Sequence, residues 1–393
     1  MRIAVMLFSK NTISQVGGRE RIFTEMSNNL SLRGHDVLAV WNDKPGAVPF
    51  FPLNRHVERL NLSLGRLRPS AGAALLQGLS RGLGVGSGMQ AQDDMARTLA
   101  NEFLRNHAVR DVEIFVCFDY MSVLMARRLG NGKIPIVWRI GSVPGEELSK
   151  LNRAELKAAA NADACVVMQE PFIEHAKKYL GGNARIEAIP NPVPLVPESS
   201  SADFYARKTV RRIVHIGRLE GHRKRQMMLV RAFQPLAKTY PSWEVRMYGP
   251  VADPDYQRSM ASYLKKYHLQ KQVRFCGVTG KISSVLRSAD IFAFPSAWEG
   301  FSLAMTEAMG AGLPVLAFKG APGVSTLIEH GVNGLLAKDE TDFQGHLQRL
   351  IRNRRLRIKL GGNARMSMEK YSPDIVWPAW ESLLRDVVWR RRK

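Results

Sequence analysis

Two glutamates eight positions apart stand out in a stretch that otherwise has the composition of a buried core. Glu299 follows the apolar run 290–294, and Glu307 lies within 302–311, whose Leu, Met and Ala residues predict a helix. A second apolar run, 314–318, comes next. The pattern predicts a strand, a loop, a helix and a strand, the unit from which parallel sheets are built. Such sheets bind ligands at the carboxyl ends of their strands, where Glu299 would lie.

The start of this helix is suited to an anion. The backbone amides of Phe301, Ser302 and Leu303 have no partner within a helix that begins there, and they coincide with the positive end of the helix dipole. Glu307, about a turn deeper, can accept hydrogen bonds from a vicinal diol such as a ribose, and Glu299 can accept them from a second sugar. The arrangement suits a phosphate with a sugar on each side, as in a nucleotide sugar.

A basic turn carries the second set of candidate residues. The run GRLEGHRKRQ, residues 217–226, follows a predicted strand and puts Arg218 at its end and Lys224 near the next helix. Arginine makes planar, two-pronged contacts with phosphate, whereas lysine contributes a mobile point charge. We therefore predict that Arg218 and Lys224 bind a diphosphate together, with Arg223 as an alternative to Lys224.

The sequence around the two glutamates resembles the signature of family 4 of the retaining glycosyltransferases. That signature has a Glu, seven residues, a second Glu and then Ala-x-x-x-Gly-x-Pro-Val, which corresponds here to Glu299, Glu307 and residues 308–315. In the family the first Glu contacts the transferred sugar and the second the ribose of the nucleotide. By resemblance, Arg218 and Lys224 hold the donor diphosphate, and residues 277–280 lie beside the base.

The resemblance also implies a fold and a reaction. It implies an α/β protein of the GT-B fold, with two facing Rossmann-like domains and a C-terminal helix that crosses back to the first. The expected activity is a retaining, metal-independent transfer of a hexose from a nucleoside-diphosphate sugar, with no cofactor. The expected acceptor is a lipid-linked, lipopolysaccharide or exopolysaccharide glycan.

The length of the chain supports two domains. At 393 residues it exceeds the length at which one hydrophobic core usually stops growing. Two successive strand–helix series are separated by the proline-rich run 190–194. We predict an N-terminal, acceptor-side domain over 1–195, a nucleotide-sugar-binding domain over 196–372 and a helix over 373–393 that packs back on the first domain.

The N-terminal domain carries weaker signals. Gly17 and Gly18 precede the first helix and let the backbone approach a ligand closely; by resemblance, they face the donor's phosphate and sugar, although a plain turn would have the same sequence. Many relatives have a His after a later strand of this domain, near the reacting sugar. Gly141 and Ser142 stand there instead, and the candidate polar contacts nearby are Arg139 and Ser142.

Composition limits the classes of protein that fit. The chain is 45% hydrophobic and 23% charged, as in globular proteins, and we expect no signal peptide and no membrane-spanning segment. Cys117, Cys165 and Cys276 form an odd set without metal-ligand spacing, which predicts buried, reduced thiols in a cytosolic protein. The Asp-Pro-Asp run at 253–255 lies in a polar turn, and we expect no metal site there.

The formal charge of +22 calls for an anionic partner or a solvated basic surface. Aromatic residues are not interleaved with the basic clusters as in single-strand binders, so we expect no nucleic acid and favour an anionic membrane surface. Residues 61–92 mix Leu with Arg66, Arg68 and Arg81, which suits a mobile element at a membrane interface or a flexible insertion. The predicted location is cytoplasmic, peripheral on the inner face of the cytoplasmic membrane.

Other functions fit part of the pattern. A nucleotide-sugar epimerase or a sugar-phosphate synthase of the same fold would share the donor-binding residues. A nucleic-acid-binding protein would share only the basic charge. The two glutamates could also be solvated residues of a loop and a helix surface.

Overall fold

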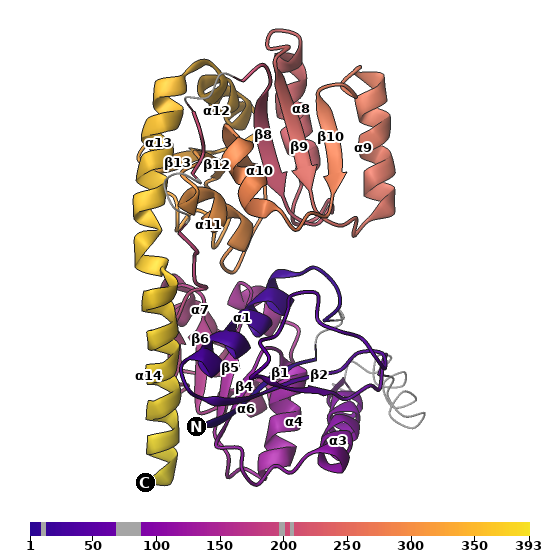
Figure 1. Ribbon diagram of the computed structural model, residues 1–393, viewed down its shortest axis with the longest axis vertical. Coiled ribbons are helices and arrows are strands. Elements are labelled where there is room, and N and C mark those ends of the chain that lie inside the picture. The colour runs from indigo at the N-terminus through magenta and orange to yellow at the C-terminus, as the bar shows by residue number, and fades with distance from the viewer. Residues whose placement is uncertain (9–12, 68–87, 196–200, 205–207) are drawn as a thin grey trace. The chain divides into compact units, whose positions relative to one another are not determined.

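The computed structural model describes residues 1–8, 13–67, 88–195, 201–204 and 208–393 (Figure 1). The chain divides into two compact units. Unit 1 comprises Met1–Asn191 and Val376–Lys393, and unit 2 comprises Pro192–Ile375. These divisions differ by a few residues from the predicted boundaries. Residues 68–87, most of the segment predicted to act at a membrane, lie outside the described residues.

Unit 1 is built on a seven-stranded parallel sheet in the order β3-β2-β1-β4-β5-β6-β7. Its central strands are continuous apolar runs, as expected when helices cover both faces of a sheet. The strands are β1 (Arg2–Leu7), β2 (Asp36–Trp41), β3 (Glu58–Asn61), β4 (Ile114–Cys117), β5 (Ile136–Arg139), β6 (Ala164–Val167) and β7 (Ile186–Ala188). The helices are α1 (Gly18–Leu32), α3 (Gly88–Asn106), α4 (Tyr120–Gly130), α5 (Pro144–Leu148), α6 (Arg153–Ala160) and α7 (Pro171–Leu180).

Unit 2 repeats this plan with a six-stranded parallel sheet in the order β10-β9-β8-β11-β12-β13. The strands are β8 (Arg211–Ile216), β9 (Trp243–Tyr248), β10 (Val273–Gly277), β11 (Ile291–Phe294), β12 (Val315–Phe318) and β13 (Gly334–Ala337). The helices are α8 (Gln226–Ala237), α9 (Pro254–Lys266), α10 (Ile282–Ser288), α11 (Leu303–Gly310), α12 (Glu340–Arg352), α13 (Arg354–Ser367) and the short η2 (Glu369–Tyr371). The predicted fold class, two Rossmann-like α/β domains, is confirmed.

The strand orders fix where each unit can bind a ligand. In unit 1, β1 lies between β2, which follows it in the sequence, and β4, to which the chain crosses over later. In unit 2, β8 lies between β9 and β11 in the same arrangement. At such a switch point the loops after the two central strands diverge and leave a crevice at their carboxyl ends. Glu299 and the basic turn follow β11 and β8, so both predicted site segments lie at the switch point of unit 2.

The last helix, α14 (Pro373–Arg392), begins at the end of unit 2 and packs on unit 1 from Val376 onward (Figure 1). Ion pairs accompany the apolar contact: Arg185 Nη2 lies 2.7 Å from a carboxylate oxygen of Asp386. His35, which is buried, lies with Nε2 3.2 Å from Glu381 Oε1. The core of unit 1 is therefore completed by a helix that follows all of unit 2 in the sequence.

Two local predictions have clear outcomes. The helix predicted over 302–311 is α11, and Ser302 is its N-cap, with Oγ accepting a hydrogen bond from the Met305 amide at 3.4 Å. Cys117 and Cys165 are buried, but Cys276, also predicted to be buried, is exposed. The reason is that β10 is an edge strand of its sheet.

Two of the three tryptophans of α14, Trp380 and Trp389, allow a matched test of its packing. Trp380 is 2% exposed and Trp389 is 55% exposed. We expect Trp380→Ala to lower the free energy of unfolding of unit 1 by about 3–5 kcal/mol, because a large buried side chain is lost. Trp389→Ala, on the same helix, should change it by less than about 0.5 kcal/mol. Urea unfolding followed by circular dichroism measures both, and equal losses would contradict the assignment of α14 to the core of unit 1.

Candidate functional site

The centre of the site in unit 2 is a buried ion pair. Lys224 Nζ donates a hydrogen bond to Glu299 Oε1, and each side chain is only 10% exposed. The Lys224 stem lies against Gly217 at the end of β8, and its ammonium lies 5.3 Å from the ring centroid of Phe294 at the end of β11. The pair therefore sits at the switch point itself, and it joins two segments that are 75 residues apart.

Burial and charge act in opposite directions on this pair. Burial alone would raise the pKa of Glu299, but the Lys224 ammonium and Arg223 outweigh it and hold the pKa below its usual value. Burial lowers the pKa of Lys224, and the attraction of Glu299 offsets this only in part. The carboxylate thus stays ionised, and the ammonium is a better proton donor than a solvated lysine.

A buried histidine and a glutamine fix the basic turn. Gln226 Nε2 donates to the carbonyl oxygen of Arg218 at 2.7 Å and lies 3.3 Å from His215 Nε2. His215 Nδ1 lies 3.0 Å from the carbonyl oxygen of Ala293 on β11. Burial lowers the pKa of His215 to about 4, so its ring is neutral. A neutral ring that donates from Nδ1 accepts at Nε2, which fits the position of the Gln226 amide.

Backbone contacts connect the basic turn to the loop that carries Glu299. The amide of Ala297 donates to the carbonyl oxygen of Arg223 at 2.8 Å, and Arg225 Nε donates to that of Pro295 at 3.0 Å. The Glu299 amide in turn donates to the carbonyl oxygen of Pro322 at 2.9 Å. The positions of both charged groups are thus set by hydrogen bonds of the main chain around them.

Gly323 is a site residue that the sequence analysis missed. Its φ of +70° favours glycine, and a Cβ there would lie 1.7 Å from the carbonyl oxygen of Glu299. The backbone at Gly323 therefore packs directly against the backbone of the Glu299 loop, at a distance that only glycine permits. The Pro322-Gly323 pair signals a turn in the sequence, but not the loop that the turn supports.

The other predicted basic residues lie around the pair. Arg218, whose side chain is 36% exposed, has Nη2 3.9 Å from Glu220 Oε2. Arg223, the alternative to Lys224, has Nε 3.2 Å from the other oxygen of the same carboxylate. The structure thus places Lys224 beside Glu299 and Arg223 beside Glu220.

The predicted anion site has the expected local geometry. α11 begins at Leu303, so Phe301, Ser302 and Leu303 form its N-terminus, and Phe301 and Ser302 are buried. Glu307 is half-buried in the middle of the helix. The Phe301 ring packs edge-on against Tyr371, with centroids 5.3 Å apart, which anchors the loop at η2.

The predicted residues of unit 1 lie on different elements from those of unit 2 and are described separately. Gly17 is the N-cap of α1, which begins at Gly18, and a Cβ on Gly17 would lie 1.9 Å from Oε2 of Glu20. The close approach that glycine permits here is therefore to a carboxylate of its own helix. Gly141 and Ser142 follow β5 and are half-buried.

Two cavities of unit 2 bear on the location of a ligand. The first, about 230 Å³ in volume, lies at the carboxyl ends of β8, β9 and β10. It is lined by Gly217, Leu219, Gln226, Met247, Tyr248, Gly249, Val251, Gln257, Phe275 and Gly277. Two of these residues flank Arg218, so this cavity adjoins the basic turn. It includes Gly277, the start of the segment predicted to lie beside a base.

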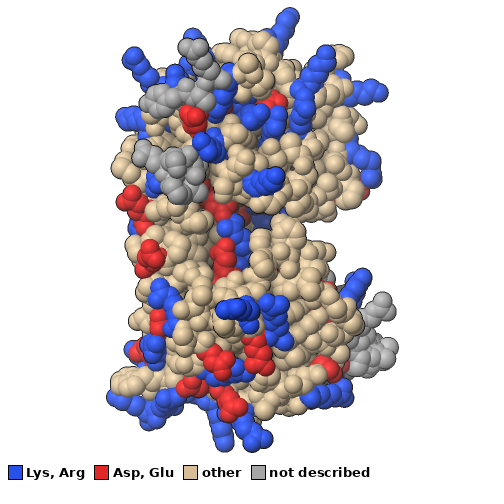
Figure 2. Space-filling model, viewed as in Figure 1, with Lys and Arg blue, Asp and Glu red and all other residues tan. Residues whose placement is uncertain are grey.

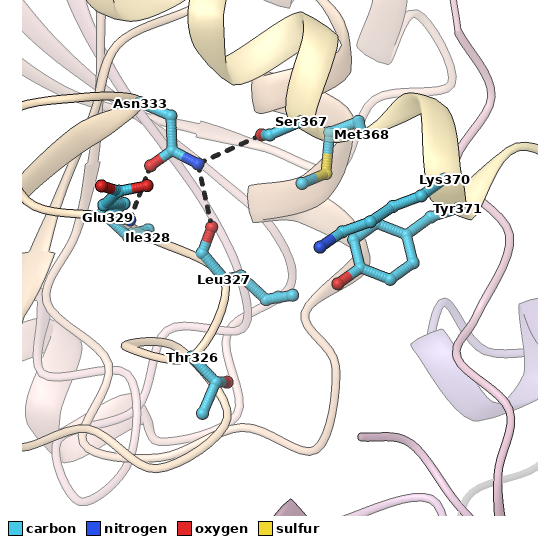
Figure 3. A pocket seen from close by; sticks show the side chains of 9 residues that line it. All are labelled: Thr326, Leu327, Ile328, Glu329, Asn333, Ser367, Met368, Lys370 and Tyr371. Carbon is cyan, nitrogen blue, oxygen red and sulfur yellow. Dashed lines mark hydrogen bonds between the residues drawn. The ribbon is translucent and has the colours of Figure 1, made fainter. Parts of the chain in front are cut away.

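The second cavity, about 390 Å³ in volume, lies between the segment 326–333 and the end of α13 with η2 (Figure 3). One polar residue of its wall is satisfied by protein groups: Asn333 Nδ2 donates to Leu327 O at 3.3 Å and to Ser367 Oγ at 3.1 Å. Residues predicted for the site are not part of its lining. Of the two cavities, the first is therefore the one that adjoins predicted site residues.

The Asp-Pro-Asp run has a structural role. Asp253 is the N-cap of α9 and accepts from the Tyr256 amide at 3.0 Å, and Asp255 pairs with Arg258. Across the described residues, no group of three or more His, Cys, Asp or Glu side chains is arranged to hold a metal ion.

The two parallel sheets, each with its own switch point, give the chain the GT-B fold of glycosyltransferases. Residues 198–367, nearly all of unit 2, match the protein family described as "Glycosyl transferases group 1". This part of the chain is therefore similar to group 1 glycosyltransferases. The predicted family is supported at this level.

Individual relatives agree with the family match. The chain is 30% identical over 201 residues to an uncharacterized glycosyltransferase of Haemophilus influenzae, covering 51% of this chain and 55% of the relative. It is 25% identical over 217 residues to the amylovoran biosynthesis glycosyltransferase AmsD of Erwinia amylovora, covering 54% and 60%. The chain thus spans a little over half the length of these relatives.

A solved structure extends the likeness over the whole chain. HepE of Anabaena, in complex with UDP and glucose, superposes with a TM-score of 0.72 and covers 98% of this chain and 100% of its own. The sequence identity is 18%, so this likeness shows the fold.

Gly323 and Gly331 provide a matched test of the support beneath Glu299. Both have positive φ, but a Cβ on Gly331 would meet nothing within 4 Å. We expect Gly323→Ala to cost about 1–3 kcal/mol more than Gly331→Ala, because only the first adds overpacking to backbone strain. It should also weaken nucleotide-sugar binding, which Gly331→Ala should leave intact. Thermal unfolding and titration calorimetry measure the two effects, and equal behaviour of the variants would contradict the role of Gly323.

Proposed function

We propose that this protein is a retaining, metal-independent glycosyltransferase that moves a hexose from a nucleoside-diphosphate sugar to a glycan or glycolipid. The observation that carries the proposal is the buried Lys224–Glu299 pair at the switch point of unit 2, next to the N-terminus of α11 and a cavity of about 230 Å³. Cations, helix amides and a carboxylate lie on the loops that follow β8 and β11, and they are the groups that would bind a diphosphate and its two sugars.

Each residue has a role in this proposal. Arg218, Lys224 and the amides of Phe301, Ser302 and Leu303 bind the diphosphate. A base fits the cavity that ends at Gly277, and Glu307 accepts hydrogen bonds from the ribose. Glu299, freed from Lys224 by the incoming phosphate, accepts hydrogen bonds from the hydroxyls of the transferred sugar.

The proposed reaction depends on the negative charge that develops on the leaving group. The bond between the anomeric carbon and the diphosphate oxygen breaks, and the leaving group gains negative charge that Arg218, Lys224 and the helix amides neutralise without a metal ion. The acceptor hydroxyl attacks from the side of the leaving group, which retains the anomeric configuration. Its proton passes to the departing phosphate, which acts as the base.

The acceptor and the location are further parts of the proposal. The likeness to an enzyme of amylovoran biosynthesis supports a polysaccharide or a lipid-linked precursor as the acceptor. We place the protein at the inner face of the cytoplasmic membrane, bound to anionic lipid. Within the described residues, no helix has the length and apolar composition to span a bilayer. Lys and Arg side chains are spread over the face of unit 2 in Figure 2, with few carboxylates among them.

The diphosphate clamp can be tested on the intact protein. Arg218→Ala should lower turnover with the preferred nucleotide sugar about 10²–10³-fold, because it removes a donor aimed at the developing charge. Arg258→Ala, also in unit 2 with a side chain 71% exposed, is the matched control and should keep full activity. Donors are first ranked by thermal shift among uridine- and guanosine-diphosphate sugars, and turnover is then measured with and without EDTA.

Lys224 needs a different design because it is buried. Lys224→Gln alone leaves the Glu299 carboxylate without its counter-charge, at a cost of about 3–5 kcal/mol of stability. The double variant Lys224→Gln/Glu299→Gln restores a neutral pair and should fold while remaining inactive. Near-normal turnover in both the Arg218 and the Lys224 variants would rule out the clamp, and loss of wild-type turnover in EDTA would rule out metal independence. Donor alone yielding an epimerised sugar would favour an epimerase instead.

Membrane binding gives a separate prediction. Arg352, Arg355 and Lys359 form an exposed basic group on α12 and α13. We expect vesicles that contain phosphatidylglycerol to bind the protein at low salt and release it at high salt, because the attraction is screened. The charge-reversed variant Arg352→Glu/Arg355→Glu/Lys359→Glu should bind more weakly. Absence of binding to anionic vesicles at low salt, measured by flotation, would contradict a peripheral location.

A further inference from the structure

The loop that carries Glu299 also contains a buried hydroxyl group without a partner. Ser296 lies on this loop between the end of β11 and Glu299. Its side chain is buried, at 0% exposure, and its Oγ makes no hydrogen bond to the residues that the structure describes. A buried hydroxyl in this situation costs free energy and is uncommon in folded proteins. Its presence beside the buried ion pair therefore points to a partner that the hydroxyl gains at another stage.

The main chain on both sides of Ser296 is held by the basic turn. Arg225 Nε donates to the carbonyl oxygen of Pro295 at 3.0 Å, and the Ala297 amide donates to that of Arg223 at 2.8 Å. The position of the Ser296 backbone is therefore fixed. Its hydroxyl can still move between staggered positions, by rotation about the Cα–Cβ bond, without any movement of the loop.

The group closest in function to this hydroxyl is the Glu299 carboxylate. Burial raises the pKa of Glu299, Lys224 and Arg223 outweigh that effect, and the Ser296 hydroxyl adds a smaller lowering effect. The two side chains are thus near enough to interact, although they make no hydrogen bond of ordinary geometry. In this structure the carboxylate accepts from the Lys224 ammonium instead.

The proposed binding of a diphosphate changes the surroundings of Glu299. The phosphate becomes the partner of Lys224, so the carboxylate, which is 10% exposed, loses its counter-charge. A buried carboxylate without a partner is costly. Arg223 is already paired, with Nε 3.2 Å from Glu220 Oε1. His215 has a neutral ring whose Nδ1 lies 3.0 Å from a main-chain carbonyl oxygen. Neither residue is therefore free to replace the ammonium.

We propose that Ser296 is a positioning residue for Glu299, whose hydroxyl turns to donate a hydrogen bond to the carboxylate when a diphosphate binds Lys224. This bond keeps the carboxylate ionised and in place, and the carboxylate can then accept further hydrogen bonds from the transferred sugar. The hydroxyl favours binding because it has no partner before binding and gains one afterwards. This inference rests on the proposed function and adds to it the group that takes over from the ammonium.

Replacement of Ser296 separates this role from a structural one. Ser296→Ala should leave the melting temperature of the protein unchanged or higher, because the hydroxyl that it removes has no partner. It should weaken binding of the nucleotide sugar that ranks first by thermal shift about 10-fold at about pH 8, because the complex loses a hydrogen bond to a charged group. Thermal unfolding and titration calorimetry measure the two effects.

Ser288 provides the matched control. It precedes β11, whereas Ser296 follows it, and its Oγ donates to the carbonyl oxygen of Val285 at 2.9 Å. Ser288→Ala should leave the affinity for the nucleotide sugar unchanged.

The effect of Ser296→Ala should also depend on pH. A hydroxyl that donates to a carboxylate favours the ionised form, so its loss raises the pKa of Glu299 in the complex. At about pH 5, uptake of a proton by Glu299 removes the unpaired charge, and the difference in affinity between variant and wild type should shrink. The other groups that face Glu299, namely Lys224, Arg223 and His215, are the same in both proteins. The pKa of His215, about 4, lies below the range of the test.

Three results would overturn the role of Ser296 while leaving the proposed function in place. They are an unchanged affinity of Ser296→Ala at about pH 8, a loss of affinity that is equal at both pH values, and a lower melting temperature. The last would mean that the hydroxyl already has a stabilising partner without the nucleotide sugar. A wild type that binds none of the nucleotide sugars overturns the proposed function, and this inference falls with it.

Discussion

The structure of unit 2 depends on two opposite charges held where water is largely excluded. Lys224 and Glu299 come from loops after β8 and β11, and either charge alone would be costly to bury. Neither loop can therefore adopt its position independently, and the backbone hydrogen bonds between them reinforce the same geometry. The pair also keeps the Lys224 ammonium charged and in a fixed position, so an anion that enters the crevice meets a cation that is already in place.

Much of the fold could be predicted from local patterns. Parallel strands covered on both faces are continuous apolar runs, so strands such as β1 and β11 are visible in the sequence without any knowledge of their neighbours. The start of α11 was also predictable, because Ser302 is a good N-cap and Leu303 begins an apolar stretch. These features depend on residues close together in the chain.

The features that could not be predicted from the sequence depend on contacts between residues that are far apart in the chain. Nothing local indicates that Lys224, rather than Arg223, turns toward Glu299, since that follows from how two loops cross at the switch point. Gly323 marks a turn, but the carbonyl it supports belongs to another loop. Cys276 was misjudged because an apolar run does not show whether its strand will be central or at the edge of the sheet.

The course of α14 has a consequence for biosynthesis. Unit 1 contains segments that precede and follow unit 2 in the sequence, and the side chains of α14 that complete its core, such as Trp380, are translated after all of unit 2. During synthesis, unit 2 can finish folding before α14 emerges from the ribosome, whereas unit 1 keeps an apolar surface uncovered until α14 is available. Synthesis of α14 is therefore what completes unit 1, and a product that stops before α14 would expose the surface that chaperones and proteases recognise.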